Sequence, residues 1–331
     1  MKTPSQRSRR GFTLIELLVA MAITTVIVTV LVSVTAMALE SWNRSRAEIR
    51  AARQAKSMID TMARDFESFV SRKGNDFEWL YAKSAPPSEG PKGNLSPNAL
   101  DLVFFSAATD RYNGKIGTAT DLGGDVSTVG YKLTYKDPIA GAVNDEYKTF
   151  VLYRKLVDPK ETFDKILGQA IIKTPFDAAS GTAIDKEENF ICENVYQFTV
   201  TFHVSATVPD TSKPGNPPPT ILKSVAVPIG NKDSDLSGKD YVLTKNFSIT
   251  GSGIITNFEP ASNVGVTNPQ LKAGRLSAAE ISITVLSDFG MQQMRRREFV
   301  ATDKKTAEEV KADFIAKHSY QYSKVVQLPG S

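Results

Sequence analysis

Residues 7–39 read RSRRGFTLIELLVAMAITTVIVTVLVSVTAMAL, and this stretch decides the class of the protein. Residues 12–39 contain a single charged side chain, that of Glu16. As one helix this run would span about 42 Å, whereas the hydrocarbon core of a bilayer is about 30 Å thick. A secretory signal peptide has a shorter apolar run with small residues at its end. The stretch therefore predicts a membrane-spanning helix, and hydropathy alone favours an ordinary anchor.

Two features of this stretch are not explained by an anchor. Glu16 lies within the apolar run, where an unpaired carboxylate is costly in lipid, so its presence suggests a partner. A basic leader also ends in Gly11, directly before Phe12. Residues 11–18, GFTLIELL, resemble the class III signal of type IV pilins and type II secretion pseudopilins.

The resemblance implies a processing route in the bacterial inner membrane. A prepilin peptidase would cut between Gly11 and Phe12 and would methylate the new terminal amine of Phe12. Glu16 would then pair with the terminal amine of a neighbouring subunit during filament assembly. This role agrees with the physical requirement that a buried carboxylate needs a cation, which a free amine can supply.

The expected location is a single-pass protein of the inner membrane with its C-terminal domain in the periplasm, and later a pseudopilus or pilus. The balance of basic residues does not settle this orientation. Residues 1–11 hold four of them and residues 40–59 hold five. The expected orientation therefore rests on the processing motif.

The helix is expected to continue well beyond the membrane. Neither Gly nor Pro occurs in residues 12–73, and the proline that breaks the apolar segment of many pilins is absent. Gly74 is therefore the expected end of a straight helix. Apolar residues recur at helical spacing in its second half, which should pack on a globular domain. They are Ala52, Ala55, Ile59, Met62, Phe66 and Phe69.

After residue 74 the apolar pattern changes to a period of two, which predicts a β-rich domain. His203 falls on the solvent side of one alternating run and is not expected to be a ligand. The Pro/Gly-rich residues 209–220 form either a long hairpin connection, which we favour, or a hinge between two lobes. The expected strands are residues 102–106, 131–135, 149–156, 196–204, 225–229, 241–249 and 281–286.

The predicted fold class is therefore α+β, and the resemblance implies the lollipop architecture of pilins. The expected divisions are a leader at residues 1–11 and a membrane or filament-core half-helix at 12–39. An amphipathic half-helix at 40–74 and a periplasmic β-rich domain at 75–331 would follow. A short final helix is indicated by a capping box, Thr306 to Glu309.

Composition excludes several other kinds of protein. The 331 residues include 40 basic and 36 acidic ones, and without residues 1–11 the two numbers are equal, so no global argument for nucleic-acid binding remains. One cysteine excludes an intramolecular disulfide, and two histidines exclude a zinc site built on several of them. No hydrolase, metalloprotease or nucleotide-loop motif occurs. A non-enzymatic protein without a cofactor is expected.

Two local patterns have a weaker functional interpretation. Asp233, Asp235 and Asp240 surround Gly238 as in a calcium loop, but Thr244 stands where a bidentate glutamate belongs. A solvated turn is the favoured interpretation, with calcium as the alternative. The basic residues 295–297 are expected on a solvated surface, or else in a docking patch for an acidic partner.

Short patterns favour the J-type minor pseudopilins and the related W-type minor pilins. Residues 57–70 resemble the membrane-distal helix of that group, in which an Asp follows a mixed run. Residues 129–136 and 150–158 resemble its strand pair with a Leu-Tyr-Arg element, and residues 193–204 and 277–288 resemble two later strands. The chain is longer than usual for this group.

The resemblance implies a structural minor pseudopilin that supports protein export at or near the tip of a type II secretion pseudopilus. Its partners would be prepilin peptidase, other pilins or pseudopilins in a filament, and the inner membrane. The alternative is a minor pilin of a type IV pilus, acting in adhesion, motility or DNA uptake, and only DNA uptake would involve nucleic acid. A product of a pilin-like gene cassette, or a membrane-anchored periplasmic enzyme or binding protein, are further alternatives.

Overall fold

The structure is a computed structural model that describes residues 13–107, 125–139, 147–210, 212–213, 218–230, 244–256 and 265–329. The chain forms two compact units, Met1–Ile49 and Arg50–Ser331. Helix α1, Leu14–Glu67, contributes to both units. The second unit, called the body below, contains all the other elements.

The body consists of short helices and antiparallel strands. The helices are α2 Pro159–Glu161, α3 Lys173–Ala178, α4 Asn268–Lys272, α5 Asp288–Arg296 and α6 Ala307–His318, with short turns η1 Pro91–Gly93, η2 Thr162–Ile166, η3 Ala179–Gly181 and η4 Glu187–Asn189. The strands are β1 Glu78–Ser84, β2 Leu100–Ser106, β3 Ser127–Lys136, β4 Thr149–Val157, β5 Phe190–Glu193, β6 Val195–Pro209, β7 Thr220–Ile229, β8 Asn246–Thr250, β9 Gly253–Thr256, β10 Arg275–Leu286 and β11 Ser319–Gln327.

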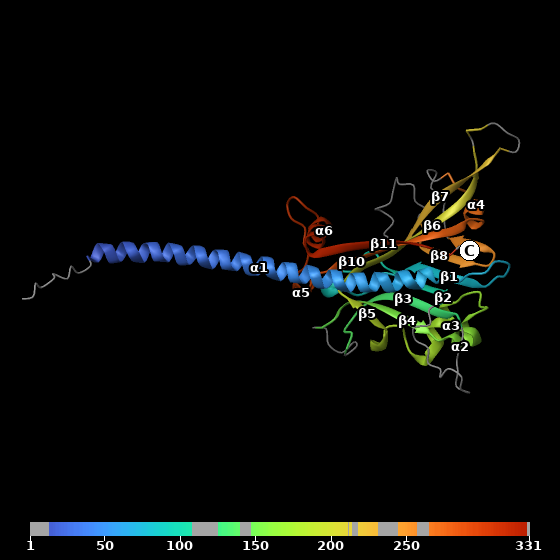
Figure 1. The fold of residues 1–331 in the computed structure, drawn as a ribbon, viewed down its shortest axis with the longest axis horizontal. Helices are drawn as coiled ribbons and strands as arrows, with labels where there is room; N and C mark the ends of the chain where they lie inside the picture. Colours follow the sequence, from blue (N-terminus) through green and yellow to red (C-terminus); the bar gives the residue numbers. More distant parts are fainter. Residues whose placement is uncertain are drawn as a thin grey trace, which may run out of the picture. The chain divides into compact units, whose positions relative to one another are not determined.

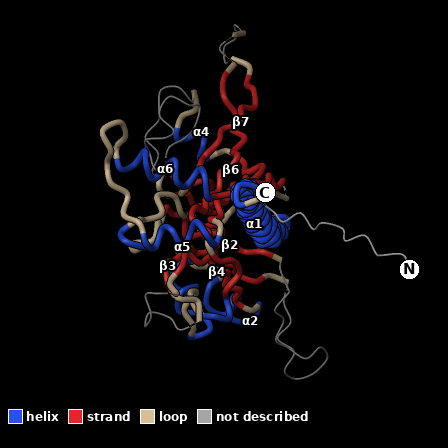
Figure 2. The backbone as a smooth tube through the Cα atoms, turned by 90° about the vertical axis from the view of Figure 1, so that its left-hand side faces the viewer, coloured by secondary structure: helices blue, strands red, loops and turns tan. Residues whose placement is uncertain are grey.

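The strands of the body form two antiparallel sheets. The larger sheet has the order β5-β4-β3-β2-β1-β8-β9, and the smaller sheet has the order β11-β10-β6-β7. Figure 1 shows the β6–β7 hairpin extending beyond the other strands, and Figure 2 shows the short helices of the body placed around the strands. The α+β class, with a long N-terminal helix and antiparallel sheets, is confirmed.

The alternating patterns locate seven of these strands: β2, β3, β4, β6, β7, β8 and β10. Residues 241–243 of the expected strand 241–249 lie outside the described residues. β6 and β7 pair as far as Pro209 and Thr220, so the Pro/Gly-rich segment between them is a hairpin connection and does not divide two lobes.

The remaining four described strands, β1, β5, β9 and β11, were not expected from the sequence, and three of them show why. β5 and β9 are four residues long, which is too short for a visible alternation. β11 is an edge strand in which only Val326 is buried, so solvent permits polar residues on both faces. These strands form because a neighbouring strand offers free backbone groups.

Helix α1 ends at Glu67, before Gly74, where the sequence predicted its end. The amide of Val70 donates to the carbonyl of Phe105 over 2.9 Å, and the amide of Ala107 donates to the carbonyl of Ser68 over 2.8 Å. The end of β2 thus takes over the backbone groups that a further helical turn would have used. Gly74 instead has a φ of +85° in the turn before β1.

The apolar stripe of α1 packs against both sheets, as its spacing predicts. The Phe66 ring stacks on Phe104 of β2, with centroids 4.6 Å apart, and meets the edge of Phe202 of β6 at 6.3 Å. Phe202 in turn stacks on Phe247 of β8 at 4.5 Å. The helix therefore joins the two sheets through one continuous aromatic cluster, in which each pair adds to the energy of apolar burial.

A buried ion pair fixes the helix on the larger sheet. The two Asp65 oxygens accept hydrogen bonds from Nε and Nη2 of Arg154 on β4, each over 2.8 Å. The Tyr131 hydroxyl of β3 donates to the same carboxylate. Burial raises the pKa of Tyr131 well above its usual value, so its hydroxyl keeps this proton. All three side chains are buried, so each depends on the others for its polar contacts.

We predict that Arg154→Met lowers the free energy of unfolding of the body by about 3–5 kcal/mol, because Asp65 remains buried without its cation. Chemical denaturation of the full chain in detergent, followed by the fluorescence of the buried Trp79, measures this loss. Adding Asp65→Asn, which keeps an acceptor for Tyr131, should recover part of it.

The matched control is Lys324→Met, which removes a half-exposed ion pair between β11 and Asp60 of the same helix. Exposed pairs contribute little, so this variant should unfold at nearly the wild-type denaturant concentration. Equal losses from the two variants would contradict a special role for the buried pair.

Candidate functional site

The start of α1 is a capping box formed by Thr13 and Glu16. The Thr13 backbone N–H donates to the Glu16 carboxylate over 2.8 Å, and the Glu16 N–H donates to the Thr13 hydroxyl over 3.3 Å. The Thr13 hydroxyl also donates to the carboxylate over 2.9 Å. Glu16 thus has a partner within its own chain, which sequence reasoning missed although Thr-x-x-Glu is a capping signal.

The apolar part of α1 is suited to a surrounding without water. Its most apolar window has a mean hydropathy of 2.7, and none of that window is buried within the protein. The hydroxyls in this part each donate to the carbonyl four residues earlier, over 2.7–2.9 Å, so none needs a solvent partner. These residues are Thr24, Thr25, Thr29, Ser33 and Thr35.

The other residues singled out in the sequence have different outcomes. Gly11 and Phe12 lie outside the described residues, as do Asp233, Asp235 and Asp240. His203 is half-exposed on β6, with its Nε2 3.9 Å from a carboxylate oxygen of Glu280, as expected for a solvent-side residue.

Two expectations for the C-terminal part can be compared with the structure. The capping box at Thr306 begins α6, with Glu309 accepting from the Thr306 N–H over 2.7 Å. In the basic cluster, Arg296 and Arg297 are exposed at the end of α5, whereas Arg295 is half-buried. The Arg295 guanidinium donates to the carbonyl of Tyr147 over 3.5 Å.

The body holds a second buried cation, Lys155, next to Arg154 on β4. Successive residues of a strand point to opposite faces, so Lys155 points away from α1. Its Nζ donates to the carbonyls of Ala179, Thr182 and Phe176 over 2.7, 2.8 and 3.1 Å. The three donors of an ammonium group are thereby all used. Burial lowers the pKa of Lys155.

Gly130 of β3 makes room for this arrangement. It pairs with Lys155 in the sheet, and a Cβ at this position would lie 2.3 Å from Cζ of Phe176. The Phe176 ring covers the lysine, with its centroid 5.1 Å from Nζ. Only a glycine at this position lets the ring approach the sheet and close over the charge.

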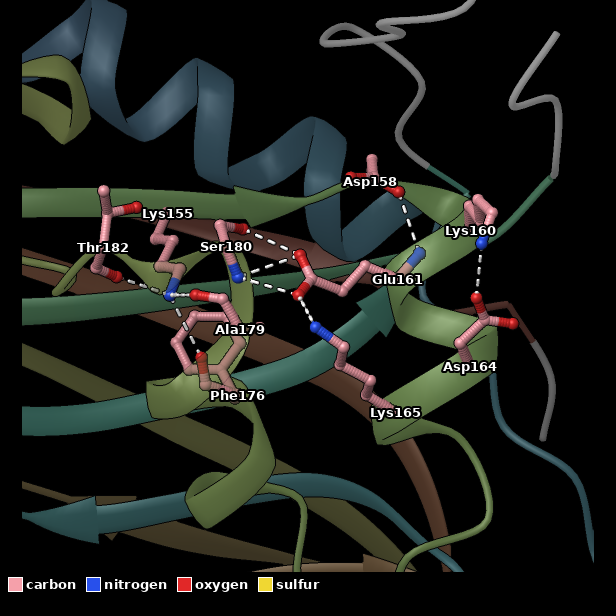
Figure 3. Close-up of polar contacts among 10 residues, drawn as sticks. All are labelled: Lys155, Asp158, Lys160, Glu161, Asp164, Lys165, Phe176, Ala179, Ser180 and Thr182. Atoms are coloured by element: carbon pink, nitrogen blue, oxygen red, sulfur yellow. Dashed lines mark hydrogen bonds and ion pairs between the residues drawn. The ribbon is translucent and has the colours of Figure 1, made fainter. Parts of the chain in front are cut away.

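Glu161 holds the turn that presents the carbonyls to Lys155 (Figure 3). Its carboxylate accepts from the Ser180 N–H over 2.9 Å and from Lys165 over 2.6 Å. Ser180 has a φ of +59°, a left-handed conformation that a non-glycine residue adopts only with such support. Burial opposes ionisation, but the hydrogen bonds from Lys165 and Ser180 leave the pKa of Glu161 below its usual value.

The chemistry of these groups is structural. Lys155 is enclosed by carbonyls and an aromatic ring, so its amine does not face a substrate. Burial also raises the pKa of Cys192 to about 12, so its thiolate is scarce at neutral pH. Within the described part of the chain, no group of three or more His, Cys, Asp or Glu side chains could hold a metal ion.

We predict that Lys155→Met lowers the free energy of unfolding by about 1–3 kcal/mol, because the buried carbonyls lose their donor. The loss should depend on pH. The pKa of Lys155 is lowered in the folded state. Between this lowered pKa and the free-lysine pKa of about 10.4, the unfolded chain therefore binds more protons than the folded chain. Wild type should therefore gain stability over the variant as the pH rises toward that value.

Denaturation at several pH values measures both effects, and Lys160→Met is the matched control. Lys160 is exposed in the same region and pairs with Asp164 over 2.7 Å (Figure 3). The Lys160→Met variant should unfold like wild type at every pH. A difference between Lys155→Met and wild type that shrinks with rising pH would contradict the assignment.

Comparisons with known proteins add to the amino-terminal site. Residues 6–32 match the family model described as the prokaryotic N-terminal methylation motif. No curated protein matches the chain significantly. A solved type IV-like pilin from Thermus thermophilus is 9% identical, with 85% of this chain and 97% of that chain covered, at a TM-score of 0.31.

The matched segment contains Gly11, Phe12 and Glu16. A motif of this type implies processing by a peptidase and assembly with other pilins. The apolar helix that continues from it is consistent with anchoring in a membrane. Residues 6–32 of this chain therefore carry a prepilin-type N-terminal methylation motif.

Proposed function

We propose that the protein is a minor pseudopilin of a type II secretion system. Prepilin peptidase would cut it between Gly11 and Phe12, leaving the body in the periplasm. It would then assemble at or near the tip of the pseudopilus and support protein export. The observation that carries the proposal is the methylation motif at residues 6–32, in which Glu16 is the only charge of a long apolar run.

The apolar half of α1 supports a role in assembly. Its side chains are exposed to solvent within one chain, and apolar surface of this extent needs lipid or other helices around it. Once the protein leaves the membrane, a filament of parallel helices would surround this apolar half of α1 with other helices. The Glu16 carboxylate would then exchange contacts with its own Thr13 for a neighbouring amine, which compensates its charge in the apolar core.

The buried ion pair supports the choice of a J-type or W-type minor subunit. The resemblance to that group lies in residues 57–70 and 150–158, which are far apart in the sequence. Asp65 from the first segment and Arg154 from the second form the ion pair that holds α1 on the sheet. The two segments thus make one structural unit.

The alternative is a minor pilin of a type IV pilus, in adhesion, motility or DNA uptake, which would share the whole amino-terminal site. A role without catalysis agrees with Lys155 and Cys192 being enclosed. For Asp233, Asp235 and Asp240 a solvated turn stays the favoured prediction, and calcium binding stays its alternative. Calcium calorimetry with wild type and Asp235→Ala would test it.

Variants of Glu16 can separate helix capping from charge pairing. Glutamine also serves as the third residue of a capping box, so Glu16→Gln keeps the cap and removes the charge. We predict that Glu16→Gln and Glu16→Ala are both cleaved after Gly11, and that both enter filaments at a level reduced at least tenfold. Quantitative immunoblots of sheared filaments and membranes measure this ratio.

Glu40→Ala is the control, because it removes a carboxylate just beyond the other end of the apolar run. It should assemble like wild type. Normal assembly of Glu16→Gln together with failure of Glu16→Ala would assign Glu16 to capping alone, and it would refute the pairing with a neighbouring amine.

Crosslinking in cells, read by mass spectrometry, tests the proposed position in the filament. We expect a methylated Phe12 at the amino terminus and crosslinks from the body to a few scarce pilin-like proteins of a secretion system. Crosslinks mainly to further copies of the chain would make it a major subunit. An intact Met1 without pilin-like neighbours would leave a membrane-anchored domain.

A further inference from the structure

A small pocket lies where three segments of the body meet, and its volume is about 140 Å³. The first segment, residues 71–73, follows the end of α1. The second is the turn between β8 and β9, and the third is the C-terminal end of α4. Sequence patterns do not indicate that these segments meet, because about 180 residues separate the first from the second.

Glycines bring the backbones close enough to form this pocket. A Cβ on Gly253, whose φ is +128°, would lie 2.3 Å from the carbonyl oxygen of Lys272. A Cβ on Gly251 would lie 2.2 Å from Oδ1 of Asn75. The turn between β8 and β9 therefore packs between α4 on one side and Asn75, which precedes β1, on the other.

Three cations line the pocket: Arg72, Lys73 and Lys272. All three are exposed, and among the described residues none of them takes part in an ion pair or a side-chain hydrogen bond. The described residues that line the pocket include no carboxylate, and they add the hydroxyl of Ser71. Three like charges around one cavity repel one another, so an anion that enters the cavity lowers the electrostatic energy.

We propose that this pocket binds a phosphate group that carries two negative charges. Arginine matches a tetrahedral oxyanion with two parallel hydrogen bonds, and the two lysines add point charges. The volume is below the roughly 300 Å³ at which pockets for drug-sized ligands begin, so the pocket takes the phosphate group and little else. Free phosphate and a terminal phosphomonoester of a larger molecule share this chemistry.

Calorimetric titration of the full chain, in a non-ionic detergent and phosphate-free buffer, tests the proposal. The probes are inorganic phosphate, glycerol 3-phosphate and the monoanion dimethyl phosphate. We expect saturable binding of one phosphate per chain, and binding of dimethyl phosphate at least tenfold weaker. Binding of both dianions means that the pocket recognises the phosphate group itself, and binding of glycerol 3-phosphate alone identifies an organic phosphomonoester as its ligand.

Substitutions locate the binding in the pocket. Lys272→Gln and Arg72→Gln should each weaken phosphate binding about tenfold or more, whereas Lys304→Gln removes an exposed lysine from a distant turn and should not. Circular dichroism checks that each variant is folded. Heat that does not saturate, equal weakening in Lys304→Gln, or equal binding of dimethyl phosphate would overturn the proposal. These outcomes are independent of filament assembly, which Glu16 tests.

Discussion

The ion pair between Asp65 and Arg154 is the interaction on which the arrangement of the body depends. A helix whose apolar stripe touches two sheets can slide by one turn and still bury apolar side chains, because the hydrophobic effect is non-directional. A carboxylate with two oxygens bonded to one guanidinium has a single acceptable position. The Tyr131 hydroxyl adds a third donor from the neighbouring strand. Polar contacts thus set the register of α1, and apolar burial supplies most of its energy.

The same strand also fixes the opposite face of the sheet. Arg154 and Lys155 are neighbours on β4, and each is buried by a different layer. Arg154 meets a carboxylate on α1, whereas Lys155 meets backbone carbonyls from the segment around α3. The larger sheet is therefore covered on both faces at this strand. Arg154 and Lys155 would be expected in solvent from their residue types, but each one binds the layer that covers its own face of the sheet.

Helix α1 combines two kinds of surface in one uninterrupted element. Its first half has no buried residue in its most apolar window, while eight residues of its second half are buried. At its start, Glu16 satisfies the free N–H of Thr13. The carboxylate therefore stabilises the helix end before any neighbour is present. The pairing with a neighbouring amine that we propose would have to compete with this local contact.

Pattern and motif in the sequence determined the amino-terminal site, the apolar run, the stripe from Ala55 to Phe66 and the seven strands with clear alternation. These features depend on residues that are close in the chain, so spacing alone reveals them. The end of α1 at Glu67, the strands β5 and β11, and the burial of Arg154 and Lys155 were decided by tertiary structure. In each case a distant segment supplies the backbone groups or the counter-charge, and the sequence does not show which distant segments meet. For the same reason the pocket around Lys272 is invisible in the sequence, since its cations come together only through the fold.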